Sequence, residues 1–317
     1  MKRSDSMTAK VEQYLAFRRG LGYKLRIEGR LLEQFAHYAD RTGHRGPLTV
    51  ELALRWARLP READQLYWAR RLEIVRCFAR HLAAVEPATQ VPPRHLLGTA
   101  HRRTTPHIYS NSEVAALITA AQQLHPANGL RPRTHATLIG LLACAGLRIS
   151  EALRLQRSDV DFHRGAVTIW ETKFGMSRIV PLHPTATHAL AMYARDRDRL
   201  ISKAPCNHFF VSDWGERLPY STVRTVFRKL CDGLRIKGLV RRPRLHDLRH
   251  TFACRRVERW YDAGVHLPHA VSALSVYLGH AKVSDTYWYL TATPDLMARA
   301  AARFESFTRP AEGEVLP

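Results

Sequence analysis

The sequence of 317 residues is poor in cysteine and has no long apolar run. Its five cysteines are scattered, and no two of them form a CxxC pair, so neither a disulfide framework nor a zinc site is indicated. No run of 18 apolar residues occurs, and no apolar signal-peptide segment follows the first residues. These absences predict a soluble cytoplasmic protein with reduced thiols.

Acidic residues are also scarce, with 28 Asp and Glu against 49 Lys and Arg, so the net charge is +21. A protein this basic usually binds a polyanion, and nucleic acid is the leading candidate, although a solvated basic surface would give the same composition. The 45% of hydrophobic and 24% of charged residues are ordinary for a globular protein and argue against a disordered chain. The length allows two domains.

Four segments follow one another along the chain. Apolar residues at helical spacing predict an all-helical N-terminal domain in residues 1–86. Prolines without any periodicity predict an interdomain linker in residues 87–109. Residues 110–308 are predicted to form the larger second domain, and residues 309–317 a C-terminal tail.

The second domain is predicted to be mainly helical with one small β-sheet, which is an α+β arrangement. Ser110 and Glu113 have the spacing of a capping box at a helix start. Residues 167–170 and 178–182 are predicted as two strands of a hairpin whose loop spans residues 173–177. Helical patterns cover residues 133–157, 184–200, 220–235, 246–261, 267–278 and 294–307.

Residues able to act on a phosphodiester gather between His246 and Tyr289. His246 and Arg249 stand three apart and share one helix face, and His280 precedes Tyr289 by nine residues. Arginine binds phosphate, imidazole transfers protons and a phenol can attack phosphorus, so the set indicates metal-free phosphoryl transfer. Alternatively, the histidines cap helices and the aromatic residues pack. On a helix Tyr287 and Tyr289 point about 200° apart, so only one of them can face a given site.

Two further residues could complete such a site. Arg148 follows a glycine break at a helix start and supplies a second guanidinium, which matches phosphate geometry. Lys173 lies in the hairpin loop, where a mobile ammonium could protonate a leaving oxygen. Alone, either residue would be an ordinary surface cation. Asp159 and Asp161 are interpreted as turn residues rather than metal ligands, so no metal or other cofactor is predicted.

Together these segments resemble the tyrosine recombinase (phage integrase) family. Residues 146–151 (Gly-Leu-Arg-Ile-Ser-Glu) resemble its first box, and residues 172–182 resemble the hairpin that carries its catalytic lysine. Residues 246–253 are similar to the second box, and residues 278–289 to the third. These elements together, in the family's order, are far more specific than any one of them. The match covers residues 110–307 strongly, whereas the N-terminal domain matches only in kind, as a helical core-binding (SAM-like) domain.

The resemblance implies a role for each residue of the boxes. Arg148 and Arg249 would clamp the scissile phosphate. Tyr289 would attack phosphorus to give a 3′-phosphotyrosyl link, and Lys173 would protonate the departing 5′ oxygen. His246 would accept the tyrosine proton.

Two residues would support this set. By the same resemblance, His280 would hydrogen-bond the phosphate. Glu151 follows Arg148 by three residues and could orient its guanidinium, or form an ordinary surface ion pair. Neither ATP nor another cofactor is implied, because the covalent link conserves the energy of the phosphodiester.

Basic residues outside the boxes are candidates for contacts to the DNA backbone, which give affinity and salt dependence but no sequence readout. The alternative for each is a solvated helix face or loop. The candidates are Arg70, Arg76, Arg80, Arg102, Arg103, Arg235, Lys237, Arg241, Arg242 and Arg244.

The family implies a partner and an assembly. We expect a bacterial recombinase or integrase that acts on double-stranded DNA at the nucleoid, as four protomers on two sites, with or without accessory recombinases. A long stretch at residues 260–277 looks closer to integrases of transposons and other mobile elements. Two other functions stay open. One is a type IB topoisomerase, although its members have lysine where this chain has His246, and the other is a DNA-binding regulator without catalysis.

Overall fold

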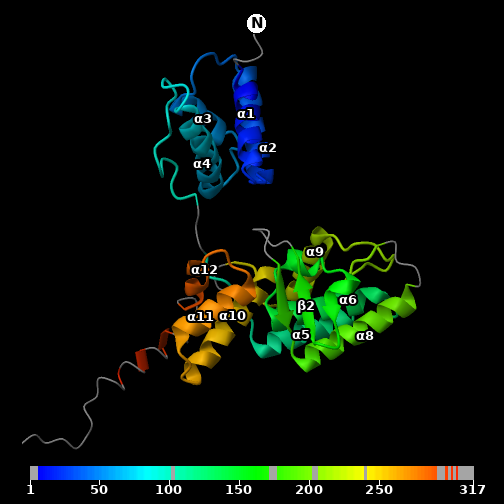
Figure 1. The fold of residues 1–317 in the computed structure, drawn as a ribbon. Helices are drawn as coiled ribbons and strands as arrows, with labels where there is room; N and C mark the ends of the chain where they lie inside the picture. Colours follow the sequence, from blue (N-terminus) through cyan, green and yellow to red (C-terminus); the bar gives the residue numbers. More distant parts are fainter. Residues whose placement is uncertain are drawn as a thin grey trace, which may run out of the picture. The chain divides into compact units, whose positions relative to one another are not determined.

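The computed structural model describes residues 6–100, 104–170, 177–201, 206–238 and 241–290, together with residues 297–298, 301–302 and 305. The chain divides into two compact units, Met1–Thr104 and Thr105–Pro317, and each has its own hydrophobic core (Figure 1). None of the helices in this described part combines the length and the apolar character that a membrane span requires.

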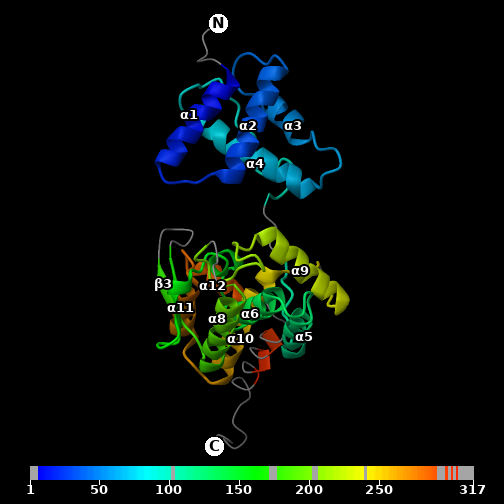
Figure 2. The same cartoon turned by 90° about the vertical axis from the view of Figure 1, so that its right-hand side faces the viewer.

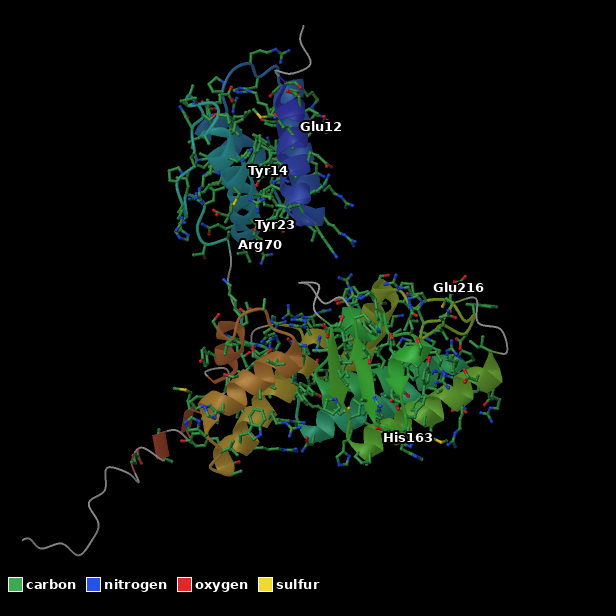
Figure 3. All side chains as sticks on the ribbon, viewed as in Figure 1. Glu12, Tyr14, Tyr23, Arg70, His163 and Glu216 are labelled. Carbon is green, nitrogen blue, oxygen red and sulfur yellow. The ribbon has the colours of Figure 1, made fainter. Side chains whose placement is uncertain are left out.

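The first unit is built from helices, as the N-terminal periodicity predicts. They are α1 (Met7–Gly20), α2 (Arg26–Arg41), α3 (Val50–Ala57) and α4 (Gln65–Leu82). Tyr14 of α1 packs against Phe78 of α4 with ring centroids 5.3 Å apart, whereas Glu12, on the outer side of α1, is exposed (Figure 3). The apolar faces of these helices therefore meet in one core.

Part of the segment that the sequence predicts as a linker packs onto the first unit. The Gln90 backbone N–H donates to the Leu48 carbonyl, and the Gln90 side chain accepts a hydrogen bond from the Val50 N–H at 3.0 Å. Leu97 is buried in the core of this unit. Packing against the first unit thus continues past residue 86, at least as far as Leu97.

The second unit is mainly helical with a small sheet, which confirms the predicted fold class. Helix α6 (Leu130–Ala145) contacts α5 (Asn111–Gln122), α8 (Pro184–Leu200) and α10 (Leu245–Asp262). In the view turned by 90°, α9 lies on the opposite side of this unit from the sheet (Figure 2). The unit also contains α7 (Ile149–Ala152), α9 (Tyr220–Gly233), α11 (Leu267–Leu278), α12 (Ser284–Tyr287) and the 3₁₀ turns η2 (Arg157–Asp159) and η3 (Trp288–Leu290).

Several predicted helix ends agree with the structure, and one does not. Ser110 and Glu113 form the predicted capping box at the start of α5, with reciprocal hydrogen bonds of 3.0 and 2.7 Å. The helical pattern predicted over residues 133–157 breaks at Gly146, as the sequence indicates, because this glycine takes a left-handed conformation that ends α6. The chain then restarts as α7, which ends at Ala152 rather than at the predicted residue 157. The helix predicted over residues 294–307 lies largely outside the described residues.

Three antiparallel strands form the sheet, in the order β1 (Val160–Asp161), β2 (Ala166–Ile169) and β3 (Arg178–Pro181). Val167 pairs with Val180, both buried, and Ile169 pairs with Arg178. Asp161 accepts hydrogen bonds from the next turn's backbone at 2.8 and 3.0 Å, so it has the turn role that the sequence predicts. Most of the predicted hairpin loop falls on residues 171–176, outside the described residues.

Gly146 is needed where α6 ends. Its φ is +60°, and a Cβ at this position would overlap the ring of Phe252 on α10. A side chain here would add backbone strain and displace a packed ring. The glycine therefore lets α10 approach the segment that leads to Arg148.

We expect Gly146→Ala to lower the free energy of unfolding by about 2–4 kcal/mol, because left-handed strain and overpacking add. Gly264→Ala is the matched control, since Gly264 has φ +68° but a Cβ added there would meet no neighbouring atom within 4 Å. It should cost only about 1–2 kcal/mol of strain. Urea unfolding of the full chain, followed by circular dichroism, measures both. Equal losses would contradict a role for the Phe252 contact.

Candidate active site

Arg249 joins the ends of two helices at the centre of the candidate site. It is only 1% exposed. Its Nη1 donates to the Gly146 carbonyl at 2.8 Å and its Nη2 to the Leu278 carbonyl at 2.7 Å, at the C-terminal ends of α6 and α11. These ends carry the negative pole of the helix dipole and favour a cation. Burial and the nearby charge of Arg148 lower the pKa of Arg249 to about 10, so it remains charged at neutral pH.

Arg148 reaches the same end of α11 from the start of α7. Its Nη2 donates to the Gly279 carbonyl at 2.9 Å, and its Nη1 donates to Glu151 Oε1 at 2.7 Å. The backbone N–H of Arg148 also donates to Glu151, at 3.0 Å. Burial raises the pKa of Glu151, but hydrogen bonds and charge from Arg178 and Arg148 outweigh it and lower the pKa to about 2. Glu151 is therefore an ionised carboxylate that holds Arg148 in place.

Arg178 is a member of this cluster that the sequence motifs missed. Its Nη2 donates to Glu151 Oε2 at 2.9 Å and its Nε donates to the Tyr277 carbonyl at 2.8 Å. A signal was present, because residues two apart on a strand share a face, and Arg178 stands two residues before the buried Val180. A charged residue on an inward face needs a partner.

Two predicted histidines adjoin the arginines. His280 follows α11 and its Nδ1 makes a 2.7 Å hydrogen bond with the Thr286 hydroxyl. Desolvation, then the charges of Arg249 and Arg148, lower the pKa of His280 to about 4. Desolvation, then Arg249, lowers the pKa of His246 to about 4 as well. His246 keeps a solvent-exposed edge, and the direction of its pKa shift favours a neutral imidazole.

Tyr289 rather than Tyr287 faces this cluster. Tyr289 is 3% exposed, and its ring stacks near His280 with centroids 6.1 Å apart, whereas Tyr287 is 50% exposed. Burial raises the pKa of Tyr289, and the charge of Arg249 opposes that rise. The arrangement agrees with the expectation that only one of the two phenols can face the site. Trp288 lies between them and packs edge-on against His250.

His250 is a second residue that the motifs left without a role. Its ring lies edge-on to His246, with centroids 4.7 Å apart, and 5.6 Å from Tyr289. Its buried Nδ1 has no hydrogen-bond partner among the described residues. Desolvation, then the neighbouring His246 and Arg244, lower the pKa of His250 to about 3. A neutral imidazole thus lies in ring contact with both His246 and Tyr289.

The other predicted site residues fall into three groups. Lys173, Arg102 and Arg103 lie outside the described residues. Arg76 is 9% exposed and paired with Glu73 at 3.0 Å. Arg241 and Arg244 pair with the buried Asp247 at 2.8 and 3.3 Å. The exposed candidates are Arg70, Arg80, Arg235, Lys237 and Arg242.

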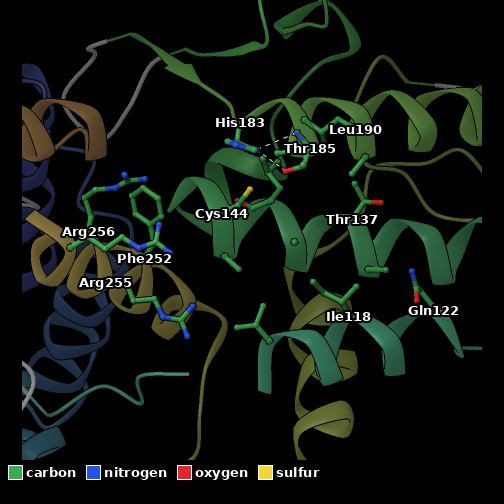
Figure 4. A pocket seen from close by; sticks show the side chains of 18 residues that line it. Ile118, Gln122, Thr137, Cys144, His183, Thr185, Leu190, Phe252, Arg255 and Arg256 are labelled. Carbon is green, nitrogen blue, oxygen red and sulfur yellow. Dashed lines mark hydrogen bonds between the residues drawn. The ribbon is translucent and has the colours of Figure 1, made fainter. Parts of the chain in front are cut away.

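A cavity of about 590 Å³ lies apart from this cluster, among α5, α6, α8 and another face of α10 (Figure 4). Ile118, Cys144, His183 and Phe252 line it, with Arg255 and Arg256 at one side. None of the clustered arginines, histidines or Tyr289 lines it. Within the described part of the chain, no three His, Cys, Asp or Glu side chains group in a way that could hold a metal ion.

Comparison with known proteins identifies the family. The Phage integrase family model matches residues 108–295. Protein y4rB of Sinorhizobium fredii, assigned to the integrases/recombinases, is 41% identical over 303 residues, which cover 93% of this chain and 96% of y4rB. Tyrosine recombinase XerD of Oceanobacillus iheyensis is 31% identical over 242 residues, covering 75% of this chain and 74% of XerD. The chain belongs to the phage integrase family, the tyrosine-type site-specific DNA recombinases, as its motifs predict.

A solved structure has the same fold. The Tn1549 transposon integrase, solved in complex with transposon right end DNA, aligns with 96% of this chain and 100% of its own chain at a TM-score of 0.68. The two sequences are 16% identical, so the comparison concerns the fold.

The lowered pKa of His250 predicts a pH dependence of stability. Below the ordinary histidine pKa of 6.5 the unfolded chain takes up a proton that folded His250, with a pKa of about 3, does not. Stability should therefore fall as the pH is lowered from about 6.5 toward 4, by at most about 1.4 kcal/mol per pH unit for each such histidine. His250→Gln should reduce this slope, measured by urea midpoints across that range.

His188→Gln is the control, because His188 is an exposed histidine on α8. It should leave the slope unchanged. If His250→Gln and the parent chain lose stability with the same slope, His250 is not held neutral by the fold.

Proposed function

We propose that this chain is a site-specific DNA recombinase or integrase that cuts and rejoins DNA strands through a 3′-phosphotyrosyl intermediate. The observation that carries the proposal is the convergence of Arg148, Arg249 and Tyr289 beside the C-terminal end of α11. Two guanidinium groups can neutralise phosphate oxygens while a phenol attacks phosphorus. Family membership supports the same reaction.

In the proposed step the Tyr289 oxygen forms a bond to phosphorus, and the bond between phosphorus and the 5′ oxygen breaks. His246 accepts the phenol proton, and Lys173 gives a proton to the departing 5′ oxygen. His280 hydrogen-bonds a phosphate oxygen. The reverse step, with the 5′ hydroxyl of another strand as nucleophile, releases Tyr289 and completes the exchange.

The proposed step uses neither ATP nor a metal ion. The phosphotyrosyl link stores the energy of the phosphodiester, so rejoining needs no other source. The guanidinium groups of Arg148 and Arg249 can neutralise the negative charge of the transition state.

The surroundings favour protonation states that suit these roles. Burial raises the pKa of Tyr289, so its phenol is protonated at neutral pH and needs a proton acceptor. Desolvation and Arg249 lower the pKa of His246 to about 4, so its imidazole is neutral and can accept that proton. A neutral His280 can still donate one ring N–H to a phosphate oxygen.

Tyr289→Phe is expected to abolish the covalent protein–DNA adduct, because the nucleophilic oxygen is removed. The recognition site is first found by sequencing the genomic fragments that this variant binds. The substrate is then a duplex of that site with a nick beside the cleavage position. Cleavage releases a short strand that diffuses away, so the strands cannot be rejoined and the adduct accumulates. Tyr287→Phe is the matched control, because Tyr287 is 50% exposed, and it should form the adduct normally. An adduct that persists in Tyr289→Phe would refute the assignment.

Two marked duplexes separate the possible functions. A recombinase exchanges the flanks of the two sites, whereas a type IB topoisomerase would relax supercoiled DNA without exchange. A DNA-binding regulator would bind the site and form no adduct. Repeating the adduct assay with a chelator tests the proposed independence of metal.

We propose double-stranded DNA as the partner and four protomers on two DNA sites as the active assembly. The structural likeness to the Tn1549 transposon integrase supports integration or transposition of a mobile element as the setting. The relatives XerD, a tyrosine recombinase, and y4rB, of the integrases/recombinases, support recombination or integration as the reaction. The exposed arginines and lysine named above would contact phosphates.

Arg242→Gln is expected to weaken DNA binding and to reduce the slope of log K against log salt by about one, since one phosphate contact is lost. Arg242 is exposed, whereas Arg76 is buried and paired with Glu73 at 3.0 Å. Arg76→Gln should leave that slope unchanged. Fluorescence anisotropy at several salt concentrations measures both variants, and equal slopes would exclude Arg242 as a contact.

A further inference from the structure

Three arginines donate to three successive carbonyls at the end of α11. Arg178 donates to Tyr277, Arg249 to Leu278 and Arg148 to Gly279, at 2.8, 2.7 and 2.9 Å. The last carbonyls of a helix have no partner within the helix, so each bond satisfies one of them. Arg178 is the one of the three for which the family resemblance implies no role.

The charge balance around Glu151 depends on Arg178. The two oxygens of Glu151 accept from Arg148 at 2.7 Å and from Arg178 at 2.9 Å, and the Glu151 side chain is 2% exposed. Two positive charges therefore share one negative charge, and one positive charge stays uncompensated. Little solvent screens this balance, because all three groups are at least partly buried.

Without Arg178, the single carboxylate of Glu151 would be balanced by Arg148 alone. The pair would then be neutral, and Arg148 would have little net attraction left for a phosphate. If Glu151 were removed as well, Arg148 would again carry an uncompensated charge. The charges of these three side chains therefore predict that phosphate binding is weakened when Arg178 is removed alone and is restored when Glu151 is removed with it.

Arg178 also fixes the backbone next to His280. A Cβ on Gly279 would lie 2.7 Å from Arg178 Nη1, so the guanidinium occupies the space beside this residue. The His280 N–H donates to the Ser275 carbonyl at 3.0 Å, which closes the end of α11. Arg178 therefore anchors the last turn before His280 to strand β3.

We propose that Arg178 is a positioning residue: it neutralises Glu151 so that Arg148 keeps a positive charge for the phosphate, and it anchors the turn that presents His280. This role rests on the function proposed above, because it assigns the phosphate of that reaction to Arg148.

Inorganic phosphate tests the charge balance without any chemistry. Its binding to the full chain is followed by NMR of the histidine ring protons. Arg178→Gln should weaken binding by about tenfold, and the double variant with Glu151→Gln should recover most of that loss. Arg178→Lys keeps the charge and should stay within about threefold of the parent chain. Arg164→Gln, whose side chain is 81% exposed, is the matched control.

The adduct assay then tests the role in the reaction. Arg178→Gln should slow adduct formation by about tenfold or more on a phosphodiester. On a methylphosphonate at the same position, which lacks one negative charge, the loss should shrink. A generally destabilised fold would slow both substrates equally.

The outcomes separate the two proposals. A parent chain that forms no adduct overturns the proposed function, while the phosphate titration still decides the role of Arg178. Unchanged phosphate affinity in Arg178→Gln, no recovery in the double variant, or equal losses on both substrates would overturn that role. If Arg178→Gln does not fold, a loss in Arg178→Lys well beyond threefold would overturn it as well.

Discussion

The crowding of three arginines at the C-terminal end of α11 is the constraint on which the rest of the candidate site depends. Like charges this close repel one another, and burial makes the repulsion larger. Two features oppose it: the negative pole of the helix, which Arg249 meets at the Leu278 carbonyl, and the ionised Glu151 between Arg148 and Arg178. The hydrogen bonds that the arginines donate also satisfy carbonyl groups at the C-terminal end of α11. Excess positive charge is therefore held at a fixed place rather than spread over a surface.

This fixed charge contributes to the protonation states of its neighbours. Desolvation is the larger cause that lowers the pKa values of His246 and His280 to about 4, and the charges of the arginines lower them further. Desolvation and positive charge together thus favour a neutral imidazole at each position. Tyr289 experiences the opposite balance, since burial raises its pKa while Arg249 lowers it. One cluster of cations consequently links the arginines proposed to bind phosphate to the histidines proposed to bind phosphate or transfer protons, and it joins segments as far apart in the sequence as Arg148 and Gly279.

Local patterns in the sequence predict much of this arrangement, and contacts between distant segments account for the rest. The bounds predicted for residues 184–200 and 267–278 are those of α8 and α11, because proline at the start and helical periodicity act locally. Spacing also favours Tyr289 over Tyr287, as the structure arranges them. Local sequence patterns could not predict the pairing of Arg178 with Glu151, because it joins strand β3 to helix α7. Only the two-residue spacing between Arg178 and the buried Val180 indicates that the arginine lies on the inward face of the strand.

Net charge indicates the class of partner more reliably than it indicates which residues touch that partner. Arg76 and Arg244 each stand three residues from an acid, Glu73 and Asp247, and both are paired with it. That spacing is visible in the sequence and identifies cations that are already partly neutralised. Arg241 also pairs with Asp247, but it lies before α10, so helical spacing does not predict this ion pair. The net charge of the chain therefore includes both cations that stabilise the fold and cations that are available to bind DNA. Acidic residues three or four positions away are the first sequence feature by which the two can be separated.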